Sequence, residues 1–99
     1  MLGAMIGDII GSVYEWNNIK TTDFILFKST CFFTDDTVLT AATAKAIMTG
    51  KDYAQVYQDF SRRYPGRGYG GNFSHWINLE DPKPYQSWGN GSAMRVSPV

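Results

Sequence analysis

The sequence has few of the residues on which disulfide frameworks and charged binding surfaces depend. Its 99 residues include one cysteine and one histidine, and Lys and Arg together equal Asp and Glu at nine each. A single cysteine, Cys31, cannot form an internal disulfide, which favours a reduced, cytoplasmic setting. The neutral charge balance excludes the broadly basic surface that general nucleic-acid or membrane-surface binding requires. We therefore expect no nucleic-acid partner and no membrane partner.

Long hydrophobic runs are also missing. The first thirteen residues are mostly apolar, but they are too short to cross a bilayer. No basic residue precedes this run and Asp8 interrupts it, so it lacks the pattern of a secretory signal peptide. Aromatic residues, in contrast, are plentiful, with three Trp, six Tyr and six Phe. This composition argues against intrinsic disorder, and the length suits one small domain, residues 1–99.

Apolar spacing and helix stop signals predict an all-α chain. Gly50 and Pro65 supply two of the stops, and Asp52 is a natural N-cap for the helix between them. Residues 24–27, Phe-Ile-Leu-Phe, are expected to form either a short strand or a loop held by its aromatic side chains. The expected helices span residues 2–15, 35–49 and 52–64, with a further short helix near 72–79.

The segment Phe32–Thr37 contains two adjacent carboxylates at the start of the second expected helix. Thr34 suits the N-cap, and Asp35 and Asp36 follow it in the first turn. Acids in a first turn often do no more than complement the helix dipole. The alternative is a hard-cation site, because magnesium prefers oxygen ligands and is usually held by one or two carboxylates. With a hydroxyl or carbonyl of Thr34, these carboxylates can serve two cations or bridge them.

The first expected helix carries a stripe of small residues. Gly3, Gly7 and Gly11 recur every four residues, and each interior glycine costs a helix roughly 1 kcal/mol relative to alanine. We therefore expect another helix or a ligand to approach this face closely. Asp8 lies on the same side, and a carboxylate in an apolar helix must be paired or must ligate. It either caps a neighbouring helix or belongs to a site.

Two glycine-rich segments lie in the second half of the chain. Gly66–Gly71 precedes the expected helix that carries His75, which we interpret as structural, and Ser87–Arg95 contains Trp88 beside Gly-Asn-Gly. Glycine runs are often flexible turns. Backbone amides at such positions also bind phosphate, and an indole can stack on a nucleobase. Near the C-terminus, Ser97 and Pro98 have the pattern of a helix start, which suggests that the chain is an N-terminal fragment.

Three segments in this order resemble the N-terminal portion of the ADP-ribosylglycohydrolase family. They are Gly3–Glu15, Phe33–Thr37 and Gly89–Arg95, and the resemblance extends over nearly the whole chain. Each motif alone is of modest specificity, but the ordered set is specific. The resemblance implies an all-α bundle of many helices around a site with two magnesium ions, in which manganese can replace magnesium. It also implies hydrolysis of ADP-ribose from ADP-ribosylated protein or a related conjugate.

The resemblance also assigns roles to individual residues of this chain. It implies metal ligation by Thr34, Asp35 and Asp36, and a catalytic role for Glu15 together with the two aspartates. On position alone, Glu15 is a solvated acid at a helix end. The residues that the resemblance assigns to ADP-ribose binding are Gly68, Tyr69, Gly70, Ser87, Trp88, Gly89, Asn90 and Gly91.

The sequence departs from the family in one respect. The family completes its metal site with a second acidic motif of the Asp-x-Asp-Thr type, and no such motif follows Asp36. Two interpretations follow. The chain is either the front portion of a hydrolase, inactive alone, or a catalytically incomplete helical module that binds ADP-ribose. In both cases we expect Asp35 and Asp36 to share one cleft with Glu15 and the Gly89–Gly91 loop. We also expect exposed apolar surface to favour self-association or contact with a missing C-terminal segment.

Overall fold

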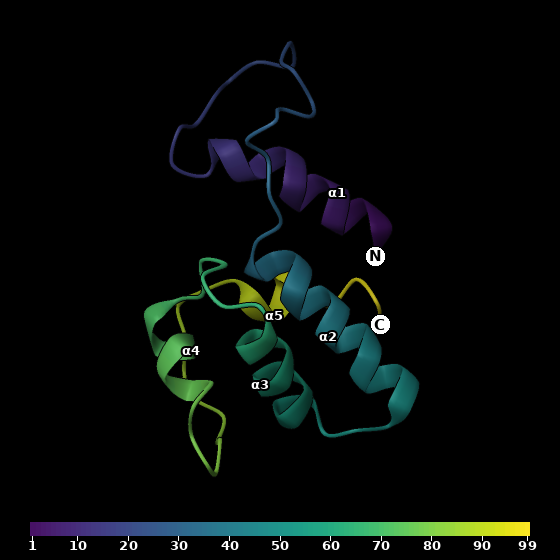
Figure 1. The fold of residues 1–99 in the computed structure, drawn as a ribbon, viewed down its shortest axis with the longest axis vertical. Coiled ribbons are helices and arrows are strands. Elements are labelled where there is room, and N and C mark those ends of the chain that lie inside the picture. The colour runs from purple at the N-terminus through teal and green to yellow at the C-terminus, as the bar shows by residue number, and fades with distance from the viewer.

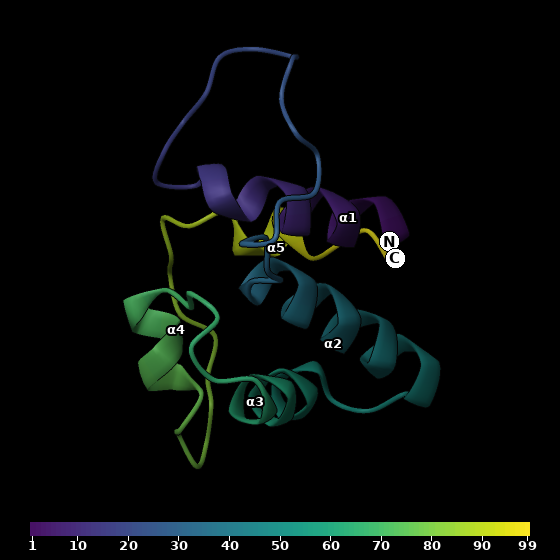
Figure 2. The same cartoon turned by 45° about the horizontal axis from the view of Figure 1, so that its top comes forward.

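The computed structural model describes residues 1–99 and is helical throughout, with no strand. This confirms the predicted all-α fold. Helix α2 occupies the centre, with α1 on one side of it and α3 on the other, and α5 lies beside α2 (Figure 1). Figure 2 shows α4 outside α3 and near the loop that leads to α5. The elements in chain order are α1 (Leu2–Gly11), the 3₁₀ turn η1 (Ser12–Tyr14), α2 (Asp35–Thr49), α3 (Tyr53–Arg63), α4 (Gly71–Trp76) and α5 (Gly91–Met94).

Helix α2 is the most buried element because three other helices pack around it. Ala42 and Ala46 are almost inaccessible to solvent and meet Val56 of α3 in a small core. Alanine at these positions lets the two helix backbones approach closely. Thr43 donates a hydrogen bond to the Leu39 carbonyl and shares another with the Tyr57 hydroxyl, at 2.9 Å each, so its buried oxygen is satisfied.

The predicted start and stop signals of α2 and α3 operate as expected. The Thr34 hydroxyl accepts a hydrogen bond from the Asp36 N–H at 3.3 Å, and the Asp52 carboxylate accepts one from the Gln55 N–H at 3.1 Å. Gly50 ends α2 in the left-handed conformation, with φ of 64°. These local signals placed both helices within a residue or two of their observed bounds.

The first helix is shorter than the predicted 2–15. It tightens into the 3₁₀ turn at Ser12, whose hydroxyl donates to the Ile9 carbonyl at 2.8 Å and accepts from the Phe32 N–H at 3.1 Å. The long loop of residues 17–33 therefore returns to the end of α1 at this point. Residues 24–27 form a loop and no strand, and Phe24 packs edge-on against Tyr14, with ring centroids 5.5 Å apart. This bears out the second of the two predicted alternatives.

The short helix predicted at 72–79 is α4, which ends at Trp76. Side chains of α3 donate hydrogen bonds to backbone carbonyls at the C-terminal end of α4. Gln58 donates to the carbonyls of Trp76 and Leu79, and Arg62 donates to that of Ile77 at 2.7 Å. These bonds satisfy carbonyls that a helix end leaves without partners, so the helix stops there. Residues 91–94, within the second glycine-rich segment, form the short helix α5, and Ser97 and Pro98 lie in a turn. No helix is both long and apolar enough to cross a membrane.

Candidate functional site

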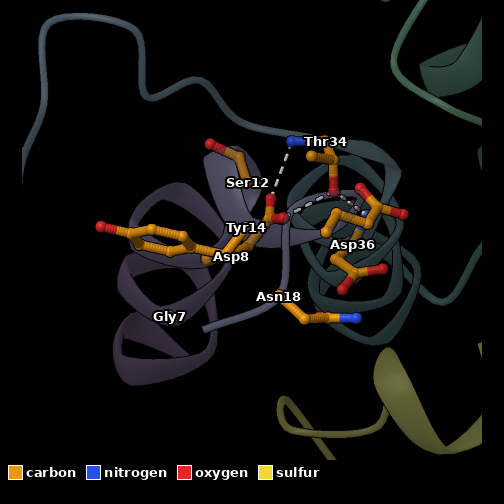
Figure 3. A pocket seen from close by; sticks show the side chains of 9 residues that line it. Gly7, Asp8, Ser12, Tyr14, Asn18, Thr34 and Asp36 are labelled. Carbon is orange, nitrogen blue, oxygen red and sulfur yellow. Dashed lines mark hydrogen bonds between the residues drawn. The ribbon is translucent and has the colours of Figure 1, made fainter. Parts of the chain in front are cut away.

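The start of α2 is held to α1 by the carboxylate of Asp8 (Figure 3). Thr34 donates to it through its N–H at 2.8 Å and its hydroxyl at 2.5 Å, and Thr37 does the same at 3.2 and 2.6 Å. Asp8 thus caps the neighbouring helix, the first of the two alternatives left open by the sequence, and it also lines a cleft on the α1 side. Because four donors satisfy this carboxylate, its role is to fix the orientation of the Thr34–Thr37 turn.

A cleft of about 240 Å³ lies beside this turn and brings together most of the predicted site residues. Asp35 and Asp36 line it from α2, Glu15 lines it from the end of η1, and both glycine-rich segments contribute backbone. The expected sharing of one cleft by the two aspartates, Glu15 and residues 89–91 is therefore found. The predicted residues in the lining are Glu15, Asp35, Asp36, Gly68, Gly70, Ser87, Gly89, Asn90 and Gly91.

Two predicted binding residues lie outside this cleft. The hydroxyl of Tyr69 donates to the Tyr64 carbonyl at 2.7 Å, and its ring lies against that of Phe73, so Tyr69 braces the loop. Trp88 is fully exposed to solvent, between Ser87 and Gly89 of the lining. Its indole has no partner in the chain and is free to cover a ligand in the cleft.

The cleft also contains residues to which the sequence assigned no role. Arg95 lines it and lies over the Tyr57 ring, with 4.7 Å from the guanidinium carbon to the ring centroid. Phe73, Met94 and Leu39 supply its apolar part. Arg95 and Met94 belong to a segment that carried the resemblance, which was the only signal for them; Phe73 and Leu39 reach the cleft only through helix packing.

A second, larger cleft of about 440 Å³ lies on the α1 side of the same carboxylates. Its lining is polar and includes Asp8, Ser12, Asn18 and Thr34, which are labelled in Figure 3. Glu15 and Asp36 line both clefts. The acidic residues are thus accessible from two directions, one bounded by the glycine-rich segments and one by the glycine face of α1.

Burial and neighbouring negative charges raise the pKa values of Asp35 and Asp36. Burial raises the pKa of Asp35 from 3.8 to about 6, and the negative charges of Asp36, Glu15 and Asp8 add to the effect. The pKa of Asp36 is raised as well, by burial first and then by Asp8 and Glu15. The start of α2 therefore concentrates negative charge that no cationic side chain of the chain neutralises by an ion pair.

The donors at the start of α2 suit a hard cation. Two carboxylates and one hydroxyl, all oxygen, lie on consecutive residues, and oxygen ligands are those that magnesium prefers. The Thr34 oxygen donates its proton to Asp8 and accepts one hydrogen bond from Asp36, which leaves it one lone pair. No three side chains among His, Cys, Asp and Glu are close enough together to hold a metal by themselves. The oxygen donors thus come from three consecutive residues at one helix start.

Comparison with known proteins identifies the family. The ADP-ribosylglycohydrolase family model matches residues 1–99, which is the whole chain. The chain belongs to the ADP-ribosylglycohydrolase family. Its membership confirms the resemblance carried by Gly3–Glu15, Phe33–Thr37 and Gly89–Arg95, and the helical fold agrees with it.

Several curated relatives of this ADP-ribosylglycohydrolase family member carry the name ADP-ribosylhydrolase ARH3. The protein of Xenopus tropicalis is 28% identical over 126 residues, covering 97% of this chain and 36% of its own length. The protein of Mus musculus is 26% identical over 134 residues, covering all of this chain and 36% of its own length. The protein of Gallus gallus is 24% identical over 139 residues, covering all of this chain and 37% of its own length. The chain thus spans little more than a third of these relatives. No solved structure matches it.

Proposed function

We propose that this chain supplies the N-terminal part of a magnesium-dependent site that hydrolyses ADP-ribose from ADP-ribosylated protein or a related ADP-ribosyl conjugate. The observation that carries the proposal is the single cleft in which Asp35, Asp36 and Glu15 face both glycine-rich segments. A cleft that is acidic at one end and lined by open backbone at the other suits a ligand with a sugar and a phosphate part. Membership of the family supports the same assignment.

Thr34, Asp35 and Asp36 are the proposed metal ligands. When bound, magnesium would supply a charge that orients ribose hydroxyls and makes an attacking water more acidic. Burial and then the neighbouring negative charges raise the pKa of Asp35, and these charges support the role because a bound cation would offset them. Asp8 holds the Thr34 hydroxyl in one orientation, so that its free lone pair keeps a constant direction.

Glu15 is the proposed catalytic acid–base or positioning group. It is exposed at the end of η1 and lines both clefts, so it can reach a substrate lying across the start of α2. Cleavage of a ribosyl bond passes through a positively charged, oxocarbenium-like state, which nearby carboxylates stabilise. Glu15 can also accept a proton from the attacking water. Asp35 and Asp36 contribute further negative charge to the same cleft.

The glycine-rich segments are the proposed binding elements for the ADP-ribosyl group. Gly68, Gly70 and Gly91 line the cleft and have no side chain in front of their backbone amides, which suits phosphate oxygens, whereas the Gly89 N–H already donates to the Ser87 hydroxyl at 3.1 Å. The exposed indole of Trp88 can stack on the base. Tyr69 acts indirectly by holding the first of these segments against the end of α3.

The test is calorimetric titration of the protein with ADP-ribose and with magnesium. We expect the Asp35→Asn, Asp36→Asn double variant to lose magnesium binding, and Trp88→Ala to weaken ADP-ribose binding by roughly 5- to 150-fold, the effect of losing one stacked base. Asp59→Asn is the matched control, because Asp59 is an exposed acid of α3 paired only with Arg63. A double variant that binds magnesium as the wild type does would contradict the proposed site.

Hydrolysis of ADP-ribosylated peptide is measured in the same samples. We expect little turnover from the 99 residues alone, because their metal ligands all come from one helix start and small misplacements cost about a hundredfold in rate. Binding without turnover would fit the alternative prediction of an ADP-ribose-binding module. Rapid turnover that the double variant abolishes would show that these residues build a complete site.

A further inference from the structure

Arg67 joins the first glycine-rich segment to the start of α2, and nothing in the proposed mechanism uses it. Its guanidinium carbon lies 3.8 Å from the centroid of the Phe33 ring, and its Nη1 donates to the Phe33 carbonyl at 3.3 Å. Its own backbone carbonyl accepts the N–H of Asp35 at 2.8 Å. One residue thus contacts both ends of the three-residue segment that leads into the aspartates.

The surroundings of Arg67 hold it in this position. The Phe33 ring also packs edge-on against Tyr64 at the end of α3, with centroids 5.8 Å apart. Tyr69 donates to the carbonyl of the same Tyr64 at 2.7 Å. Arg67 takes part in neither ion pair of the chain. Its guanidinium instead contacts the Phe33 ring and donates to the Phe33 carbonyl. The planar guanidinium suits this use, since it can stack and donate at the same time.

The next residue, Gly68, passes directly beside the Asp35 carboxylate. A Cβ placed on Gly68 would lie 3.8 Å from Asp35 Oδ1, and Gly68 itself lines the cleft. A shift of this loop toward a ligand would therefore move the Arg67 carbonyl, and with it the first N–H of α2. Conversely, a cation that reorients Asp35 would shift the loop through the bond between the Asp35 N–H and the Arg67 carbonyl.

We infer that Arg67 is a positioning residue that couples ligand binding at Gly68–Gly70 to metal binding at Asp35. The inference rests on the proposed function and adds to it a dependence of each binding event on the other. Coupling between two sites is reciprocal, so the factor by which magnesium tightens ADP-ribose binding must equal the factor by which ADP-ribose tightens magnesium binding. This factor is the quantity that Arg67 controls.

The experiment measures that factor in the wild type, in Arg67→Met and in Arg67→Lys. ADP-ribose is titrated with and without saturating magnesium, and magnesium with and without saturating ADP-ribose. We expect a wild-type factor of roughly 5 to 150, the usual range for coupled sites, and a fall of at least about threefold in Arg67→Met. Arg67→Lys should lie between them, because an ammonium keeps the charge but lacks the planar fork. Magnesium binding in the absence of ADP-ribose should change little, since Thr34, Asp35 and Asp36 remain.

Arg63→Met is the matched control. Arg63 is also an arginine near a phenylalanine ring, Phe60 at 6.0 Å, but it is exposed on α3 and paired with Asp59. It should keep the wild-type factor. A purely structural role for Arg67 would lower the free energy of unfolding without changing the factor, so unfolding is measured in parallel. If Arg67→Met does not fold, Arg67→Lys decides.

The outcomes separate the inference from the proposed function. A wild type that binds both ligands with no mutual effect, or Arg67 variants that keep the wild-type factor, would overturn the inference and leave the proposed function standing. A wild type that binds neither ligand would overturn both. A factor that falls in both Arg67 variants and not in Arg63→Met would support the inference.

Discussion

At the scale of single residues, Asp8 and Asp35 show how differently two carboxylates in one small region are used. Asp8 accepts four hydrogen bonds from Thr34 and Thr37 and is therefore committed to structure. Asp35 lines the cleft, and its N–H donates to the Arg67 carbonyl at 2.8 Å. The first carboxylate orders the turn, and the second remains available to a ligand.

Asp8→Asn should destabilise the chain by about 2 kcal/mol, the usual size of a lost charge-assisted hydrogen bond and helix cap. An amide offers one acceptor oxygen, and its NH₂ group would face the N–H and O–H donors of Thr34 and Thr37. Urea unfolding measures the loss, and Asp81→Asn, an exposed acid paired only with Lys83, is the control. Equal stability of the two variants would show that the Asp8 bonds contribute nothing net.

The pKa of Asp35, raised to about 6 in the fold against 3.8 for the free side chain, predicts a pH dependence of stability. A pKa raised by folding favours the fold while the group is protonated, so this contribution is complete below about pH 4 and is lost as the pH rises through 6. Asp35→Asn should remove the dependence. The urea unfolding midpoints of the wild type and of Asp35→Asn are measured from pH 4 to 7 without metal. The difference between the two midpoints should change with pH. A difference that stays constant over this range would contradict it.

At the scale of elements, the loop of Gly66–Gly71 is shaped by backbone conformation. Gly68 has φ of 90°, a region that side-chain-bearing residues rarely adopt, whereas Gly70 has φ of −58°. Space is not the constraint, because a Cβ on Gly68 would make only an ordinary contact with Asp35 and one on Gly70 would meet nothing. The turn at Gly68 is what directs the loop past the aspartates.

Gly68→Ala should therefore cost about 1–2 kcal/mol through backbone strain, and Gly70→Ala should be close to neutral or cost a few tenths. Thermal unfolding of both variants gives the comparison. We also expect Gly68→Ala to weaken ADP-ribose binding more than Gly70→Ala does, because relief of the strain would move the lining. Equal melting temperatures for the two variants would rule out strain at Gly68.

At the scale of the whole molecule, the chain exposes more surface than its mass requires. Its accessible area is 7098 Å², against about 5,700 Å² for a monomer of 11.1 kDa, and its radius of gyration is 14.3 Å against about 13 Å. Helix α1 has no buried residue, Leu2 on it is 71% exposed, and nothing lies within contact of its glycines. The small-residue face predicted to need a partner is uncovered within these 99 residues.

We therefore predict that the protein associates through apolar surface, since patches of this kind usually mark interfaces. Sedimentation velocity should show a sedimentation coefficient that increases with protein concentration. Disruption by a charged substitution on α1, Leu2→Lys, should shift the distribution toward monomer, while Lys51→Glu, on an exposed connection, should not. A monomer at every concentration that unfolds cooperatively would show that the chain is self-sufficient.

The predictions made from sequence succeeded where the signal is local. Thr34 and Asp52 mark helix starts through bonds to residues at most three positions away, and Gly50 ends α2 through its own backbone conformation, so α2 and α3 could be placed without tertiary information. They failed where distant residues intervene. The end of α4 depends on Gln58 and Arg62 of α3, and the tightening of α1 into η1 coincides with the bond that brings residue 32 back to Ser12.

The sequence by itself determined the helical class, the family and most of the residues that line the cleft, because ordered motifs and capping signals are written in neighbouring residues. Only the tertiary structure decided which carboxylate orders the turn and which lines the smaller cleft, because Asp8 lies 26 residues from Thr34 along the chain. It also decided the contact of Arg67 with Phe33, 34 residues away, and the exposure of Trp88. Such contacts depend on how helices pack, and no spacing within one segment encodes them.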